Sequence, residues 1–152
     1  MSRESPKAAY ELTVFLRFAD RANLSIDRSS IAHGDATRDE PDFLCRLSSG
    51  ELVGFELGRL NNPDLAKAEN HWEPINGEYI RTRDYSPDTA RKKLSMHYSV
   101  SHPVELILHK EYPQTTPDNV ALPALVPLCR EAHSYRRVWF MGDTVQMLYE
   151  RG

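Results

Sequence analysis

Two short apolar runs joined by a turn constrain the fold of this chain more than any other feature. In both runs an apolar side chain occupies every second position, which is typical of β-strands with one buried face. The intervening Ser48-Ser49-Gly50 suits a three-residue hairpin loop, because glycine readily adopts the positive φ that such a loop needs. The sequence therefore predicts a β-hairpin whose core-facing residues are Phe43, Cys45, Leu47, Val53, Phe55 and Leu57.

The expected hairpin brings two carboxylates together on its other face. Residues opposite each other in a hairpin point to the same side, so the paired residue numbers must sum to an even number to keep the apolar faces together. With this loop Leu47 pairs with Glu51, and Asp42 lies directly opposite Glu56. Even after a slip of one pair, the β carbons of the two acidic residues would be about 5 to 8 Å apart.

Two like charges at that distance need a counter-charge, and the sequence leaves two sources open. One is a divalent metal ion; oxygen-only ligation favours Mg²⁺ or Mn²⁺ over zinc. The other is a basic side chain, Arg46, Arg59 or a distant lysine, which would make the pair of Asp42 and Glu56 purely structural, as would solvation of both carboxylates on an edge strand.

Glycines flank Glu56 on its own face of the strand. Gly54 and Gly58 carry no side chain, and we interpret them as leaving room for a ligand to approach the strand.

The rest of the chain alternates helical and strand-like patterns. This order predicts one α/β domain over residues 1–152, with a mixed central β-sheet flanked by helices. Besides the first hairpin, the expected elements are a helix to about Arg21 opened by Ser5-Pro6, a strand near Ser30–His33, a short helix from Pro63-Asp64 to about Trp72, an irregular stretch Glu73–Tyr85, a helix Ser86–Tyr98, a strand Val104–His109, a partly helical Asp118–Ala132, and a second hairpin with a two-residue Gly142-Asp143 turn.

The composition of the chain limits its expected cellular location and the kinds of site that it can contain. No apolar run is long enough to cross a membrane and no apolar signal core follows Met1, so we expect a cytoplasmic protein with no membrane partner. Cys45 and Cys129 are interpreted as reduced, buried thiols. The six scattered histidines lack the spacing of a zinc-binding helix, and no serine-hydrolase or phosphate-loop motif is present.

Nucleic acid remains a candidate partner despite the net charge of −3. A cluster of basic residues and a second pair, Arg136-Arg137, could contact phosphate, although either could equally be a solvated surface. Three aromatic residues near the cluster could stack on bases, or simply close the core under a loop. The basic cluster is Arg81, Arg83, Arg91, Lys92 and Lys93, and the aromatic residues are Trp72, Tyr79 and Tyr85.

The chain resembles the PD-(D/E)XK nuclease superfamily, which has the restriction-endonuclease-like fold. Pro41-Asp42 at a strand start and Gly54-Phe55-Glu56-Leu57-Gly58 in the next strand carry the resemblance, between a leading helix and a helix–strand pair. This order covers Lys7 to about His109. More narrowly, the chain looks like small bacterial proteins that end in an Arg-Val-Trp-like strand, here Arg137-Val138-Trp139.

The resemblance implies metal-dependent hydrolysis of phosphodiester bonds. Asp42 and Glu56 match the ligands of Mg²⁺ or Mn²⁺. The superfamily's lysine, two residues after the glutamate, is replaced by Gly58. In some members a lysine of the following helix takes its place, so Lys93, or alternatively Lys92, is our candidate.

Two functions therefore follow as hypotheses. The first is a nuclease in which Asp42, Glu56 and Lys93 are catalytic; the superfamily sometimes also uses a glutamate of the first helix, for which Glu11 is the best placed, and the sequence leaves its role open. The second is a catalytically inactive descendant of the same fold that binds a partner as an accessory or immunity-type factor. It is motivated by Gly58 and the acidic net charge.

Overall fold

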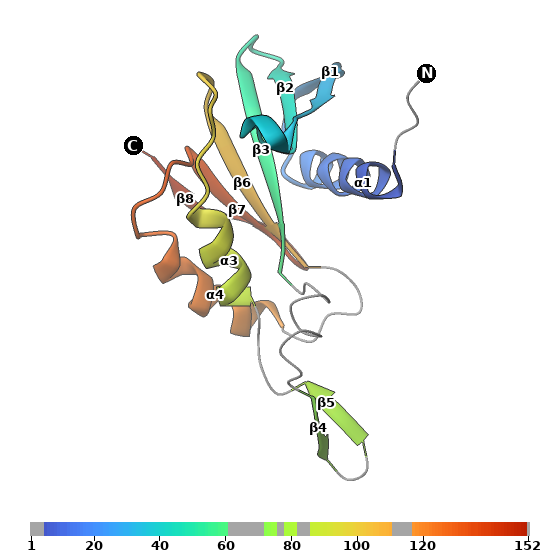
Figure 1. Cartoon of the computed structure of the whole chain (residues 1–152), viewed down its shortest axis with the longest axis vertical. Coiled ribbons are helices and arrows are strands. Elements are labelled where there is room, and N and C mark those ends of the chain that lie inside the picture. Colours follow the sequence, from blue (N-terminus) through green and yellow to red (C-terminus); the bar gives the residue numbers. More distant parts are fainter. Residues whose placement is uncertain (1–4, 61–71, 76–77, 82–85, 111–116, 152) are drawn as a thin grey trace.

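A six-stranded mixed β-sheet lies at the centre of the protein, as the computed structural model shows (Figure 1). The structure describes residues 5–60, 72–75, 78–81, 86–110 and 117–151. The three middle strands are parallel and the other pairs are antiparallel, which confirms the predicted mixed α/β architecture. In spatial order the strands are β1 (Ile26–His33), β2 (Phe43–Leu47), β3 (Leu52–Arg59), β6 (Val104–His109), β7 (Arg137–Met141) and β8 (Val145–Glu150).

Helices cover both faces of this sheet. Helix α1 (Pro6–Arg21) begins where predicted, since Ser5 Oγ accepts a hydrogen bond from the Ala8 N–H at 3.0 Å. It lies on one face, and α3 (Ser86–Leu94) and α4 (Asp118–Leu128) lie on the other (Figure 1). The described part also contains a short 3₁₀ helix, η1 (Ala36–Arg38), and a separate pair of strands, β4 (Trp72–Ile75) and β5 (Glu78–Arg81).

The first hairpin has the predicted register. Phe43 pairs with Phe55, and the Leu47 N–H donates to the Glu51 carbonyl at 2.8 Å. Gly50 in the connecting loop has φ +95°, a conformation that residues with a Cβ rarely adopt. Asp42 therefore lies opposite Glu56, as the sequence predicts.

Three predicted elements differ from the structure, and a fourth lies outside the described residues. The helix from Ser86 ends at Leu94, not Tyr98. The stretch Glu73–Tyr85 contains β5 and all of β4 except Trp72, so it is not wholly irregular. The first strand begins at Ile26 and is longer than expected. The short helix expected before Trp72 lies outside the described residues, although Trp72 itself begins β4.

The second hairpin also differs in its turn. Met141 pairs with Val145, so the loop has three residues, and the Gly142 N–H donates to the Thr144 carbonyl at 3.0 Å. The only glycine of the described part with positive φ is Gly50, so Gly142 does not form the predicted glycine-first turn.

Helix α4 continues through both of its prolines. Pro123 and Pro127 lie four residues apart, on one exposed face of the helix. The carbonyls that lose their N–H partners to these prolines can therefore face water, and the helix is uninterrupted until Leu128.

Aromatic side chains form the core between α1 and the sheet. The rings of Phe15 and Phe43 are stacked with their centroids 4.9 Å apart, and Phe15 also lies 5.0 Å from Phe55. Ile107 of β6 faces this core, whereas Leu106 and Leu108 face α3 and α4. The sheet therefore has two apolar faces at β6, which is why this strand is buried at every position.

Both cysteines are free and buried, as predicted. Burial raises the pKa of the Cys45 and Cys129 thiols to about 11, so both remain protonated near neutral pH. Within the described ranges no helix is both long and apolar enough to cross a membrane.

The aromatic core predicts a large cost for truncating Phe55, which is fully buried between Phe15 and Phe18. We expect Phe55→Ala to lower the free energy of unfolding by about 3–5 kcal/mol, measured by urea denaturation. Val120→Ala on α4 is the control, because Val120 is 54% exposed and its truncation should cost less than about 0.5 kcal/mol. Similar losses in the two variants would contradict this account of the core.

Candidate functional site

The structure joins Asp42 and Glu56 by hydrogen bonds at the start of β2. The Asp42 N–H donates to Glu56 Oε1 at 3.0 Å, and the Leu57 N–H donates to Asp42 Oδ2 at 2.8 Å. Glu56 is 3% exposed, whereas Asp42 is half-buried. Both lie on the face of the sheet that carries α3, opposite to α1.

The direction of the Pro41 carbonyl explains why the Asp42 carboxylate turns back to β3. In an antiparallel ladder the pairs that exchange backbone hydrogen bonds alternate, so after Leu47–Glu51 and Phe43–Phe55 the next such pair is Pro41–Leu57. The Pro41 carbonyl, which would accept the Leu57 N–H in a regular ladder, lies instead against Gly34, at the place a Cβ of that glycine would occupy. Asp42 Oδ2 accepts the Leu57 N–H in place of a backbone carbonyl, and this contact holds the carboxylate beside Glu56.

Lys93 of α3 reaches this pair. Its Nζ lies 2.8 Å from Glu56 Oε2, and its side chain is 24% exposed compared with 4% for Glu56. Lys92, the alternative that the sequence left open, is exposed on the same helix. The lysine that contacts the glutamate is therefore Lys93.

Gly58 makes this approach sterically feasible. A Cβ at Gly58 would lie 3.2 Å from Lys93 Cγ and 2.9 Å from Leu108 Cδ2. The stem of Lys93 thus occupies the space that a side chain at position 58 would need. A side chain at position 58 of β3 and the Lys93 side chain of α3 would occupy the same space, so a glycine in the strand allows the lysine to come from the helix.

The interpretation that both glycines leave room for a ligand is wrong. Lys93 and Leu108 fill the space at Gly58. At Gly54 a Cβ would lie 2.6 Å from Pro41 Cγ and 2.9 Å from His102 Cε1, so protein atoms close over that position as well.

Two tyrosines that the sequence does not mark as site residues are hydrogen-bonded to each other, and one of them also binds the backbone of Lys93. The Tyr135 hydroxyl donates to the Lys93 carbonyl at 2.7 Å and lies 2.8 Å from the Tyr98 hydroxyl. Burial raises the pKa of both phenols, so they stay protonated and the donor to Lys93 is kept. No local pattern marks Tyr135, because its contact joins residues 42 positions apart.

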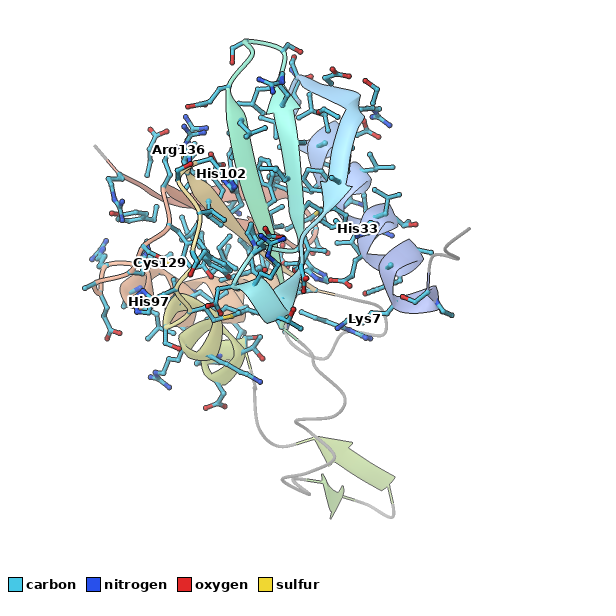
Figure 2. The ribbon with its side chains drawn as sticks, turned by 45° about the horizontal axis from the view of Figure 1, so that its top comes forward. Lys7, His33, His97, His102, Cys129 and Arg136 are labelled. Carbon is cyan, nitrogen blue, oxygen red and sulfur yellow. The ribbon has the colours of Figure 1, made fainter. Side chains whose placement is uncertain are left out.

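The carboxylates lie in one another's electric field. Burial, followed by the charge of Asp42, raises the pKa of Glu56, and Lys93 opposes the rise. Burial and then Asp42 raise the pKa of Glu11 on α1, which Lys7 opposes. Lys7 projects from the first turn of α1 (Figure 2). The structure thus places Glu11 close enough to sense the other two acidic residues.

Neither predicted arginine neutralises the pair. The Arg46 guanidinium donates to the Gly50 carbonyl at 2.8 Å. That of Arg59 lies over the Tyr10 ring, 5.7 Å from its centroid. The cation found at the carboxylates is Lys93, a distant lysine of the kind that the sequence left open as a structural counter-charge.

The oxygen atoms of Asp42 and Glu56 are of the chemical type that binds a hard divalent cation. Every available ligand atom is a carboxylate oxygen, which Mg²⁺ and Mn²⁺ prefer, and no described residue donates to Asp42 Oδ1. A cation would also relieve the repulsion that raises the pKa of Glu56. Across the described ranges no three His, Cys, Asp or Glu side chains are gathered closely enough to form a complete metal-binding set, so water or a substrate phosphate would have to supply the other ligands.

The second basic pair has a structural role. Arg136 Nη2 lies 2.8 Å from Glu105 Oε2, and Arg137 Nε lies 2.6 Å from Glu150 Oε2. The Trp139 indole N–H also donates to the 1%-exposed Glu105, at 2.7 Å. Figure 2 shows Arg136 far from Lys7. Because acidic partners engage this pair, it does not offer a free phosphate contact.

Three of the five residues of the first basic cluster, Arg91, Lys92 and Lys93, lie on α3. Arg91 and Lys92 are exposed on α3 beside Lys93. Arg81 and Tyr79 belong to β5 and Trp72 to β4, but their side chains are outside what the structure describes, as are Arg83 and Tyr85 altogether. Their contacts with nucleic acid stay a prediction.

Comparisons of the chain with family models, with curated proteins and with solved structures give no match. The fold and the site thus define a mixed α/β protein with a buried carboxylate–lysine cluster on one face of its sheet. Membership of the nuclease superfamily stays a prediction that rests on residues and element order.

The contact between Lys93 and Glu56 predicts how stability depends on pH. A buried carboxyl whose pKa is raised takes up a proton more readily in the folded state, so stability falls as pH rises from about 4.3 through the folded-state pKa. Lys93→Met removes the opposing charge and raises the pKa of Glu56 further. We expect the free energy of unfolding to fall by more in Lys93→Met than in the unsubstituted chain when the pH is raised from 4.5 to 7, measured by urea denaturation at each pH.

The matched control adds Glu56→Gln to Lys93→Met. This double variant has no carboxyl to titrate at position 56, so the extra pH dependence should disappear. If it persists, Glu56 is not its source.

The packing of Gly58 against Lys93 predicts a coupled pair of substitutions. Gly58→Ala should cost about 1–3 kcal/mol of unfolding free energy because its Cβ displaces the Lys93 stem and Leu108. In Gly58→Ala/Lys93→Ala part of that obstruction is gone, so the double variant should lose at least about 0.5 kcal/mol less than the sum of the single variants. Additive losses would show that the two positions do not compete for space.

Proposed function

We propose that this protein is a Mg²⁺- or Mn²⁺-dependent phosphodiesterase of the PD-(D/E)XK type that cleaves nucleic acid. The observation that carries the proposal is the contact of Lys93 Nζ with Glu56 Oε2 at 2.8 Å, in the space left by Gly58. It supports the view that the lysine has moved from strand to helix and has not been lost.

Each residue of the cluster has a role in this proposal. Asp42 and Glu56 would hold the cation, and Glu11 would contribute negative charge from α1 without being close enough to complete a set of three ligands. When bound, the cation would polarise a phosphate oxygen and lower the pKa of a bound water. Lys93 keeps a positive charge beside the phosphate, where it offsets the negative charge that develops during attack. Tyr135 holds the backbone of Lys93 and so restricts where the ammonium can reach.

The surface near the cluster favours a polyanionic substrate. Arg91 and Lys92 are exposed beside Lys93, and Lys7 lies on α1 near Glu11. These charges would attract phosphate locally although the net charge of the chain is −3. Within this proposal the protein acts in the cytoplasm, where both nucleic acid and Mg²⁺ are present.

Cleavage assays test the proposal directly. Purified protein is incubated with plasmid, single-stranded DNA and RNA, with Mn²⁺, Mg²⁺ or EDTA. We expect metal-dependent cleavage that Asp42→Asn, Glu56→Gln and Lys93→Met each lower at least about 100-fold. Because the pKa of Glu56 is raised, we also expect the cleavage rate to begin falling, as the pH is lowered, at a higher pH than that at which an ordinary glutamate titrates.

Lys92→Met is the matched control, since it removes the same charge one position away on an exposed side chain. It should retain cleavage within about threefold of the unsubstituted protein, as a surface charge acts mainly on association. Equal background cleavage by the unsubstituted protein and Asp42→Asn would reject the proposal and leave the inactive binding or accessory factor as the better account.

A further inference from the structure

Arg59, at the end of β3, carries a half-buried charge that has no acidic partner. Among the arginine side chains that the structure describes, those that are not exposed are Arg59, Arg136 and Arg137. Arg136 and Arg137 each form an ion pair with a carboxylate, whereas Arg59 forms no hydrogen bond or ion pair with any described residue. Its Nε is buried and has no acceptor. Native proteins seldom leave a polar group in this state, because removing it from water costs free energy that a partner normally recovers.

The Tyr10 ring holds the Arg59 guanidinium without using its hydrogen-bond donors. The central carbon of the guanidinium lies over this ring, 5.7 Å from its centroid. A contact of a cation with a ring face needs no N–H, so the donors of Arg59 remain for an acceptor. Tyr10 is 37% exposed, and of the guanidinium nitrogens only Nε is both buried and without an acceptor. The two terminal nitrogens therefore reach the surface.

The acidic residue next to Tyr10 does not neutralise Arg59. Burial and then the charge of Asp42 raise the pKa of Glu11, and the positive charges that oppose this rise are Lys7 and Lys93. Arg59 is not one of them. The positive charge of Arg59 is therefore available to an anion from outside the described part of the chain.

Arg59 lies close to the carboxylate cluster but outside it. It follows Glu56 by three positions in β3, so the two backbone positions are about 10 Å apart. Arg59 contacts α1 and Glu56 contacts α3, on the other face of the sheet. The two faces meet at this end of the sheet, since Glu11 of α1 lies in the electric field of both Asp42 and Glu56. A linear polyanion that crosses the end of β3 can therefore contact both places.

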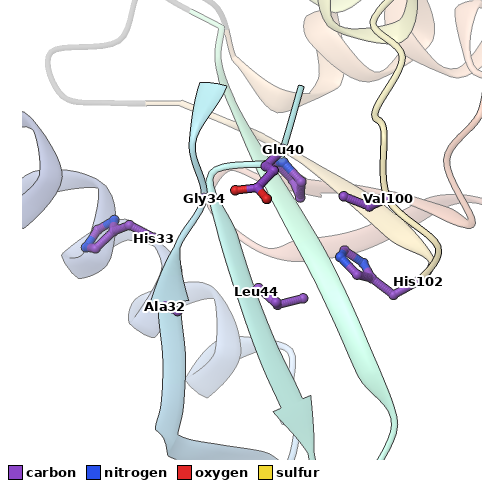
Figure 3. A pocket seen from close by; sticks show the side chains of 8 residues that line it. Ala32, His33, Gly34, Glu40, Leu44, Val100 and His102 are labelled. Atoms are coloured by element: carbon purple, nitrogen blue, oxygen red, sulfur yellow. The ribbon is translucent and has the colours of Figure 1, made fainter. Parts of the chain in front are cut away.

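The pocket beside the first hairpin does not offer an alternative place for an anion. Its walls are mostly apolar, and the Glu40 carboxylate also lines it (Figure 3). A second negative charge beside this carboxylate would be repelled. Arg59 does not line this pocket, so an anion that binds Arg59 has to lie at the surface near Tyr10.

We propose that Arg59 binds a phosphate group of a nucleic-acid strand, at a point outside the cluster of Asp42, Glu56 and Lys93. The inference rests on the proposed function only in taking nucleic acid as the polyanion. A guanidinium presents its donors in a plane that matches two phosphate oxygens, and such charged hydrogen bonds are about twice as strong as neutral ones. Lys93 cannot make this contact freely, because Glu56 already pairs with it.

Binding without metal or turnover tests this proposal. A fluorescein-labelled DNA single strand of about eight nucleotides is titrated into the full chain in EDTA at several salt concentrations, and fluorescence anisotropy is measured. We expect Arg59→Gln to weaken binding at least about fivefold and to reduce the slope of log affinity against log salt by about 0.7, the value for one lost phosphate contact. Arg59→Lys keeps the charge, so it should retain the slope while binding less tightly than arginine.

Arg17→Gln is the matched control, because Arg17 is an exposed arginine of α1. It removes the same charge and should leave both the affinity and the slope unchanged. Urea denaturation checks that each variant is folded, and Arg59→Met replaces Arg59→Gln if the latter does not fold.

Two results would overturn the proposal. The first is an unchanged affinity and salt slope in the folded Arg59→Gln or Arg59→Met variant. The second is displacement of the DNA strand by a polyglutamate peptide of the same charge as readily as by unlabelled DNA, because Arg59 would then bind carboxylates of a protein partner and not phosphate.

The outcome is separable from that of the proposed nuclease. Metal-free DNA binding that depends on Arg59, together with no Mn²⁺-dependent cleavage, would uphold the phosphate contact and reject the nuclease. Cleavage abolished by Asp42→Asn, with equal DNA binding by Arg59→Gln and the unsubstituted chain, would do the reverse.

Discussion

The antiparallel pairing of β2 with β3 is the interaction on which the rest of the structure depends. It buries Phe43 and Phe55 against Phe15 of α1, which anchors one face of the sheet. Because side chains alternate along a strand, the same register places Asp42 and Glu56 on the other face. A slip of one residue would turn the phenylalanines away from α1 and the acidic residues towards it. The apolar core therefore enforces the position of the polar cluster.

The cluster is costly to keep and is not explained by stability. Glu56 is 3% exposed, and removing a carboxylate from water costs several kcal/mol that a single ion pair rarely recovers. An apolar residue at this position would avoid the cost. Here the chain instead supplies Lys93, an aligned backbone N–H from Asp42 and a glycine that makes room for the lysine stem. Such an arrangement around a group with a raised pKa is typical of functional sites, and it supports the proposed cation site.

Much of the hairpin could be predicted because its signals are local. The alternation of apolar residues and the loop glycine were sufficient to place Asp42 opposite Glu56. The bounds of β6 were predictable for a similar reason, since an apolar run lies between Pro103 and Pro113. Predictions failed where distant contacts decide. Helix α3 ends at Leu94, and near that end Tyr135, far along the chain, donates to the carbonyl of Lys93. The turn at Gly142 also departs from its local pattern, and the Asp118 carboxylate of α4 lies where a Cβ of Gly142 would be and accepts the Asp143 N–H.

The sequence by itself determined the mixed α/β class, the register of the first hairpin and the pairing of its two acidic residues, because these follow from periodicity and turn chemistry within about twenty residues. It left open which cation opposes Glu56, because Lys92, Lys93, Arg46 and Arg59 are all basic and no local pattern places any one of them beside the carboxylate. Only the tertiary structure decided in favour of Lys93: the packing of α3 on β3 brings residues 37 positions apart within 2.8 Å. The same packing explains why position 58 is a glycine, because the atoms that fill the space of its missing side chain, those of Lys93 and Leu108, are known only from the tertiary structure.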